Sequence, residues 1–148
     1  MAPVMNSVDT ADLLRRGAAD AFAGTPVVFA FLFGSHATGR ARADSDVDVA
    51  VYLHEALADP SDMLPMSLDL AGRLAAASGL PRIEVVVLND APLGLLGSIL
   101  RERNVVYSAD EAARVRFEST MRSMAMDFEI HSRRLDRELL ARTAEGRR

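Results

Sequence analysis

Two neighbouring segments restrict what this chain can fold into: an apolar run at residues 27–33 and an alternating segment at residues 47–51. The first, Val-Val-Phe-Ala-Phe-Leu-Phe, has the length and the β-branched and aromatic content of a buried strand. The second carries Val47, Val49 and Val51 at every other position, so it is also expected to be a strand, with the valines on one face. We therefore expect a pair of strands joined by a short polar loop.

The polar loop begins with Gly34 and Ser35 and ends with Asp46, and Asp48 follows inside the second strand. Glycine lets the backbone turn sharply or lets another group approach closely, and the serine hydroxyl lies beside backbone N–H groups freed at the end of a strand. A turn of this kind is typical of a phosphate site. His36, in the same loop, is expected to be exposed, or at most to contact a nucleotide.

Asp46 and Asp48 are two positions apart, so a strand would direct both side chains to the face opposite the valines. Two like charges side by side repel each other, and burying them costs more still. A divalent cation gives a reason for the arrangement, because Mg²⁺ binds one or two carboxylates and completes its shell with water and substrate phosphates. The alternative is an exposed strand edge that carries solvated aspartates.

The wider pattern in this region reads G-S-x-A-x-G, then five residues, then S-D-x-D. The residues that make the pattern are Gly34, Ser35, Ala37, Gly39, Ser45, Asp46 and Asp48. This pattern resembles the signature of the minimal nucleotidyltransferases, in the superfamily that includes DNA polymerase beta. The resemblance implies Mg²⁺-dependent transfer of a nucleoside monophosphate, with Gly34 and Ser35 binding the nucleotide and the two aspartates binding the metal.

Composition sets limits on the class of protein. At 148 residues, with 49% hydrophobic and 26% charged residues, the chain has the size and balance of one soluble globular domain. There is no cysteine, which excludes disulfides and thiolate metal sites. The net charge of −4 argues against general nucleic-acid binding. No apolar run reaches membrane-spanning length, and the N-terminus does not resemble a signal peptide. We therefore expect a cytoplasmic protein that does not associate with a membrane.

The remaining elements follow from periodicity and from glycine and proline breaks. They are a helix through Phe22, a helix from Ser61 to Gly79, a strand at 82–88, a short helix capped by Asn89 or Asp90, and a strand at 105–107. The predicted order is helix, strand, strand, helix, strand, helix, strand. This order predicts an α/β or α+β domain with one small mixed β-sheet and flanking helices.

Glu84 is the one carboxylate in the otherwise apolar strand at 82–88. By the residues alone, it is either a strand-end glutamate that reaches solvent or pairs with Arg82, or a functional group. The resemblance to the minimal nucleotidyltransferases implies that Glu84 is the third metal ligand and accepts the proton of the attacking hydroxyl. That position usually carries aspartate in this family. The longer side chain requires the metal and base positions to readjust, so reduced activity or none is one outcome.

The tail begins with a capping box, in which Ser108 and Glu111 satisfy each other's backbone donors, and a long helix should follow. Five apolar side chains and one histidine in this helix recur every three or four residues. They are Phe117, Met121, Met124, Phe128, His131 and Leu135. This seam is expected to pack either on the chain's own domain or on a partner. We therefore divide the chain into a nucleotidyltransferase domain at 1–108 and a helical, partner-binding extension at 109–148, which frays after Leu140.

Three further segments, residues 84–89, 99–102 and 105–107, are similar to those of MntA-like antitoxins. That family is paired with HepT, a helical HEPN-type ribonuclease toxin, and the resemblance implies a hetero-oligomer in which AMP passes from ATP to a toxin tyrosine. One alternative is an inactive antitoxin that silences its partner sterically. Another is a small-molecule nucleotidyltransferase for an aminoglycoside-like alcohol, which the lack of any recognisable acceptor-binding domain disfavours.

Overall fold

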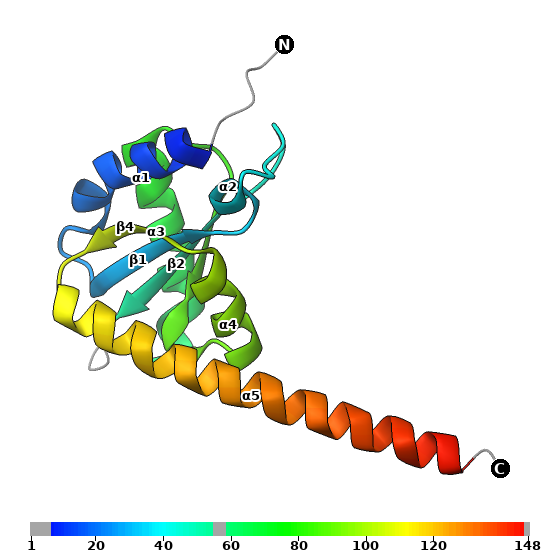
Figure 1. Cartoon of the computed structure of the whole chain (residues 1–148). Coiled ribbons are helices and arrows are strands. Elements are labelled where there is room, and N and C mark those ends of the chain that lie inside the picture. Colours follow the sequence, from blue (N-terminus) through cyan, green and yellow to red (C-terminus); the bar gives the residue numbers. More distant parts are fainter. Residues whose placement is uncertain (1–6, 55–58, 147–148) are drawn as a thin grey trace.

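The computed structural model describes residues 7–54 and 59–146, with side chains from residue 9 onward. In chain order the elements are α1 Ser7–Phe22, β1 Val27–Phe33, α2 Ser35–Thr38, β2 Val47–Leu53, the 3₁₀ turn η2 Pro60–Asp62, α3 Met63–Ser78, β3 Ile83–Val87, the 3₁₀ turn η3 Leu88–Asp90, α4 Leu93–Glu102, β4 Asn104–Ser108 and α5 Glu111–Glu145. Helices cover both faces of one sheet, and α5 passes below the sheet in this view and projects beyond it (Figure 1).

The sheet has four strands in the order β3-β2-β1-β4. The central strand β1 pairs antiparallel with both β2 and β4, whereas β3 runs parallel to β2 at the opposite edge. The register places Asp48 of β2 between Phe33 of β1 and Glu84 of β3. The predicted mixed sheet with flanking helices is therefore confirmed.

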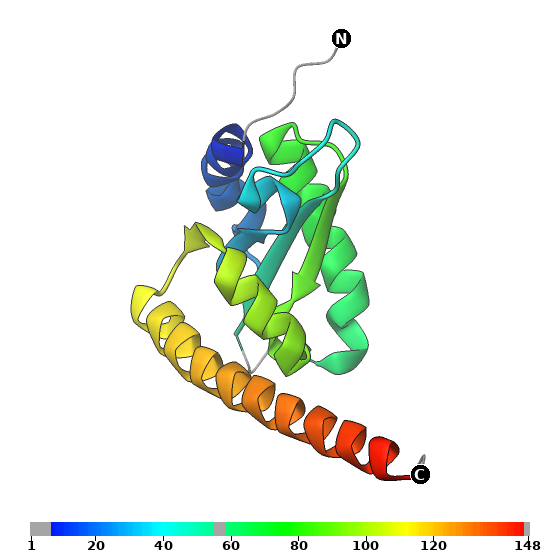
Figure 2. The ribbon, with the colours of Figure 1, turned by 45° about the vertical axis from the view of Figure 1, so that its right-hand side comes forward.

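Two apolar cores lie on the two faces of this sheet, with α3 on one side and α4 and α5 on the other (Figure 2). Val47, Val49 and Val51 are buried against α1 and α3, as their alternation predicted. Phe29 and Phe31 of β1 are buried on the other face, against α4 and the start of α5. Since strand side chains alternate, Asp48 lies on the same face as Phe33 and the α4 core.

Two predicted helix caps are wrong. Asn89 lies in the turn η3 and does not cap α4, which begins later, at Leu93. Its amide instead accepts from the N–H of Leu53 and donates to the carbonyl of Leu53, both at 2.8 Å, and so satisfies the end of β2. Ser108 is the last residue of β4, and the N-cap of α5 is Asp110, whose carboxylate accepts from the N–H of Ala113 at 3.0 Å. The Asn89 side chain thus serves the end of β2, and Ser108 belongs to β4, where it is the ladder partner of Phe29.

Only the first half of α5 packs on the body of the molecule. Phe117 and Met121 contact the second core, and Ala125 is buried. Met124, Phe128 and Leu135 of the predicted seam are 45–47% exposed. The helix continues to Glu145, so the prediction that it frays after Leu140 is wrong. Among the described residues, none of the helices is both long and apolar enough to span a bilayer.

We predict that Phe117→Ala lowers the free energy of unfolding by about 2 kcal/mol, because it removes a half-buried aromatic ring. The ring centroid of Phe117 lies 5.3 Å from that of Phe29 and 4.9 Å from that of Tyr52. Leu139→Ala, a matched truncation at a side chain that is 67% exposed, should change stability by less than about 0.5 kcal/mol. Urea unfolding measures both. Equal losses would contradict the division of α5 into a packed and a free half.

Candidate active site

The backbone at Gly34 makes the sharp turn that the sequence predicted at the end of β1. Gly34 has φ 75° and ψ −157°, which a residue with a side chain rarely adopts. A Cβ atom at this position would lie 2.3 Å from Oδ2 of Asp48, so only glycine lets the chain pass this close to the carboxylate. The carbonyl of Gly34 accepts from the N–H groups of Ala37 and Thr38 at 3.0 and 3.2 Å, which starts α2 at Ser35. Gly34 therefore lies directly beside Asp48, and Ser35 is the next residue in the chain.

The structure brings the predicted carboxylates to one end of the sheet. Asp48 and Glu84 are cross-strand partners in the β2-β3 ladder, and the charge of Glu84 acts on Asp48. Asp46 lies one residue before β2, is exposed, and is close enough for its charge to act on Asp48. Glu84 is exposed at the edge strand. Arg82 does not pair with it, since its guanidinium donates to the main-chain oxygen of Asp44 at 2.6 Å.

Asp48 carries the electrostatic cost of this arrangement. Burial, and then the charges of Glu84 and Asp46, raise the pKa of Asp48 to about 6, while His36 acts in the opposite direction. A carboxyl group with this pKa is ionised for most of the time at neutral pH, and its charge is repelled by its neighbours. A bound cation or a proton relieves this repulsion.

The donor set fits a hard divalent cation in its chemistry, because Asp46, Asp48 and Glu84 offer only carboxylate oxygens. Within residues 7–54 and 59–146, however, no three His, Asp or Glu side chains are already arranged so that they could hold a metal ion. Asp46 and Glu84 are both exposed, so their side chains have room to turn toward Asp48. Ligation by all three would require that rotation.

His36 was predicted to be exposed, and this prediction is wrong: the residue is only 5% exposed. Its Nδ1 lies 3.1 Å from Oγ1 of Thr10 in α1, and its Nε2 lies 3.3 Å from the carbonyl oxygen of Ser45. The imidazole therefore ties α2 both to α1 and to the loop that leads into Asp46. The position of His36 in a polar loop suggested that its side chain is exposed. Its structural role becomes visible only when α1 packs against the turn.

Sequence reasoning assigned no role to Glu102, although it lies in the family-like segment 99–102. Glu102 is the last residue of α4, and its Oε2 accepts from the N–H of Gly34 at 3.1 Å. The two residues are 68 positions apart. No local pattern signals this contact, because only the packing of α4 on the sheet brings the residues together.

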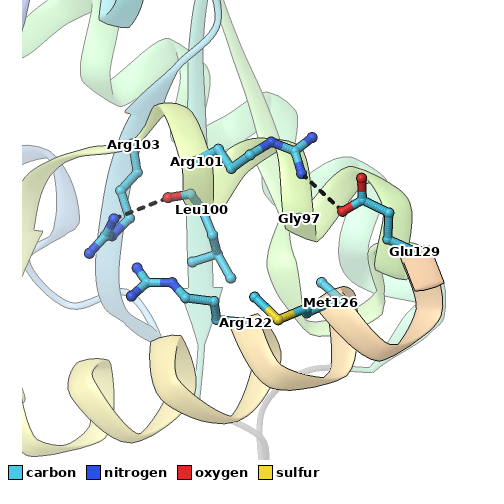
Figure 3. Close-up of a pocket in the computed structure, with 8 residues that line it drawn as sticks. Gly97, Leu100, Arg101, Arg103, Arg122, Met126 and Glu129 are labelled. Carbon is cyan, nitrogen blue, oxygen red and sulfur yellow. Dashed lines mark hydrogen bonds and ion pairs between the residues drawn. The ribbon is translucent and has the colours of Figure 1, made fainter.

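A separate groove of about 390 Å³ lies between α4 and α5 (Figure 3). Gly97 and Leu100 line it from α4, and Arg122 and Met126 from α5. The guanidinium of Arg103 donates to the carbonyl of Leu100 at 3.0 Å, and Nη1 of Arg101 lies 3.9 Å from Oε2 of Glu129 (Figure 3). None of the site carboxylates lines this groove, so we place the chemistry at Asp48 and not here.

The Gly34 turn and the carboxylates at the end of the mixed sheet form the candidate site. Residues 20–112 match the family described as Polymerase beta, Nucleotidyltransferase, and the chain belongs to this family. No curated protein sequence matches the chain significantly.

Solved structures extend the likeness over most of the chain. A crystal structure of a toxin–antitoxin with AMP-PNP is 18% identical, with 94% of this chain and 98% of that chain covered and a TM-score of 0.58. A mutant of an MntA–HpeT toxin–antitoxin is 18% identical, with coverages of 92% and 99% and a TM-score of 0.62. A tri-AMPylated Shewanella oneidensis HEPN toxin in complex with MNT antitoxin is 17% identical, with coverages of 88% and 98% and a TM-score of 0.62. At these identities the likeness establishes the fold.

We predict that Asp48→Asn raises the stability of the metal-free protein at neutral pH. Asp48 holds a proton more tightly in the folded chain than in the unfolded chain, so stability falls as the pH rises from about 4 through about 6. Above this range the folded protein carries the cost of the charge, on the order of 1 kcal/mol after allowance for solvent screening, and asparagine removes it.

Thermal unfolding with EDTA, at about pH 7.5 and about pH 4, measures this effect. The gain should appear at the higher pH and vanish at the lower one. Asp44→Asn, which neutralises an exposed carboxylate in the same loop, should change stability at neither pH. If Asp48→Asn is destabilising at the higher pH, the carboxylates do not repel each other as described.

Proposed function

We propose that this protein transfers AMP from ATP to a tyrosine of a helical, HEPN-type toxin and thereby neutralises the toxin. Membership of the nucleotidyltransferase family supports the reaction class. The acceptor is inferred from fold likeness to chains of toxin–antitoxin structures, one described with AMP-PNP and one with a tri-AMPylated HEPN toxin. The observation that carries the proposal is the contact between the Gly34 backbone and the Asp48 carboxylate. This contact brings the turn at Gly34 and Ser35, here called the phosphate turn, and the carboxylates into one site.

In this proposal Asp46, Asp48 and Glu84 hold Mg²⁺, and Gly34 and Ser35 hold the triphosphate of ATP. When bound, Mg²⁺ neutralises phosphate charge and orients the α-phosphate for in-line attack. The raised pKa of Asp48 supports a cation at this place, since like charges crowd around it. The exposure of Glu84 supports its reaching both the metal and an incoming acceptor.

At the α-phosphorus the reaction forms one bond and breaks one. The tyrosine hydroxyl oxygen attacks the α-phosphorus of ATP, the bond between the α-phosphorus and the bridging oxygen breaks, and pyrophosphate leaves with that oxygen. The hydroxyl proton passes to Glu84, which as an exposed carboxylate releases it to water. In this scheme no residue of the chain forms a covalent bond to the nucleotide. The protein contributes mainly by positioning the reactants and by stabilising the charge that develops.

We assign residues 1–108 to the catalytic domain and residues 109–148 to the partner-binding extension. Beyond Ser132 the described side chains of α5 are all exposed, and Figure 1 shows the helix projecting past the sheet. Leu135 and Leu139 of this part continue, at helical spacing, the side of α5 that carries Phe128, whose ring lies near Gly94 of α4. An amphipathic stripe of this kind suits a helical protein partner, and the complex would be a hetero-oligomer.

A second candidate function is steric silencing of the same partner without transfer. Two observations favour it: the predicted ligands are not arranged to hold a metal within the described part of the chain, and Glu84 stands where the family usually carries aspartate. Under this alternative, α5 captures the toxin and the carboxylates contribute nothing to neutralisation.

We predict that the chain, mixed with its helical partner, ATP and Mg²⁺, adds adenylyl groups that persist after the two proteins are separated. Asp46→Asn should reduce the transfer by at least about a hundredfold, because it removes a metal ligand and its charge. Glu84→Asp should keep or raise the rate, whereas Glu84→Gln should lower it strongly. The partner is incubated with the wild type or with one of the three variants and is then separated. Intact-mass spectrometry of the partner measures the adenylyl groups that each has added.

Asp44→Asn serves as the matched control, since it removes an exposed loop carboxylate that the proposal does not use. A partner that is silenced but unchanged in mass, with Asp46→Asn still neutralising it, would establish the steric alternative.

We also predict that the double variant Phe128→Ser with Leu135→Ser weakens partner capture by at least about tenfold while ATP binding stays unchanged, because both side chains lie on the free stripe. They are 45% and 47% exposed, and because the Phe128 ring lies near Gly94 of α4, the melting temperature of the variant is measured as well. The matched control is Met126→Ser with Ile130→Ser. These side chains are 58% and 56% exposed and lie on the other side of the same helix. Titration calorimetry compares the affinities, and equal losses would contradict the stripe.

A further inference from the structure

Glu102 contacts the Gly34 backbone and has no role in the proposed reaction. Its carboxylate accepts from the N–H of Gly34 at 3.1 Å in a partly buried setting. A hydrogen bond to an ionised acceptor is roughly twice as strong as a neutral one. The contact connects the end of α4 to the first residue of the phosphate turn, and the glutamate comes from the layer of helices opposite α1.

The position of Gly34 determines the geometry of the site around it. The Gly34 backbone approaches Asp48 so closely that a Cβ atom would lie 2.3 Å from Oδ2. The Gly34 carbonyl also starts α2 by accepting from Ala37 and Thr38. A change in the backbone orientation of Gly34 would therefore alter its close approach to the Asp48 carboxylate. It would also move Ser35, the first residue of α2.

Glu102 is itself held in place through the next residue. Nε and Nη2 of Arg103 donate to the two carboxylate oxygens of Glu118 in α5, at 2.6 and 3.2 Å, and Nη1 donates to the Leu100 carbonyl at 3.0 Å. Arg114 donates to the same glutamate at 2.8 Å. Burial opposes the charge of Glu118, but the two arginines outweigh it and hold its pKa below the ordinary range. Helix α4 thus ends against α5 at a defined place.

We propose that Glu102 is a positioning residue, which holds the Gly34 peptide against Asp48 and so sets the phosphate turn for nucleotidyl transfer. The part of this inference that concerns transfer rests on the proposed function. Glu102 acts through Gly34 and touches no reacting atom. The ion pair between Arg103 and Glu118 connects this contact to α5, the helix to which we assign partner binding.

The test compares Glu102→Ala, Glu102→Gln and Asp20→Ala in the full chain. Glutamine retains an acceptor of the same length without the charge, whereas alanine removes the acceptor. Asp20 is an exposed carboxylate on α1, on the other face of the sheet, and serves as the control. Amide hydrogen exchange followed by NMR reports the protection of the Gly34 N–H directly and needs neither metal nor ATP.

We expect Glu102→Ala to reduce the protection of the Gly34 amide by at least about tenfold, Glu102→Gln to restore part of it, and Asp20→Ala to leave it unchanged. In the transfer assay, kcat should fall by about tenfold in Glu102→Ala and recover in Glu102→Gln, with a smaller change in the KM for ATP. The melting temperatures of the variants should remain close to that of the wild type.

Unchanged Gly34 protection in Glu102→Ala would overturn the proposal, as would lost protection with an unchanged kcat. A wild-type protein that transfers nothing to its partner would count against the proposed function. In that case, reduced Gly34 protection in Glu102→Ala with recovery in Glu102→Gln would still establish that Glu102 holds the turn.

Discussion

The crowding of negative charge at Asp48 is the constraint on which this structure depends. The aspartate lies on β2, opposite Phe33 on one side and Glu84 on the other. It cannot move out of this place by a shift in strand register, because a slip of one residue would take Val47, Val49 and Val51 out of the core under α1 and α3 and turn Asp48 into that core. Burial of the valines therefore fixes a half-buried carboxylate at the end of the sheet, and the energy of the apolar core supports an arrangement that electrostatics alone would disfavour.

The turn that faces this carboxylate is held from both layers of helices. On one side His36 connects α2 to Thr10 of α1 and to the Ser45 carbonyl. On the other side Glu102 of α4 accepts from the Gly34 amide. A glycine turn has wide conformational freedom in an isolated peptide, and these contacts restrict it. The result is a turn with a defined distance to Asp48, which is the kind of preorganisation that positional catalysis needs.

Helix α5 performs two different structural roles along its length. Its first half completes the second core through Phe117 and Met121, and its buried Glu118 binds Arg103 and Arg114. Its second half makes little contact with the body, so its apolar side chains are left half-exposed. This exposed apolar side of α5 is the surface that we propose for partner binding.

The sequence by itself determined the local features. The apolar run at 27–33, the alternating valines and the Gly34 turn predicted two strands and their connection, since side-chain period and glycine conformation are local properties. The spacing of Asp46 and Asp48 predicted a carboxylate pair for the same reason. Their family-like pattern pointed to a nucleotidyltransferase, the family to which the chain belongs.

Only the tertiary structure decided the features that join distant parts of the chain. The burial of His36 depends on α1, and the contact between Glu102 and Gly34 depends on how α4 packs. The caps expected at Asn89 and Ser108 were wrong because a local cap pattern competes with long-range demands, and here Asn89 satisfies the end of β2 while Ser108 extends β4. Such contacts carry no short-range signal, because the free energy that selects them comes from burial and pairing between elements far apart in sequence.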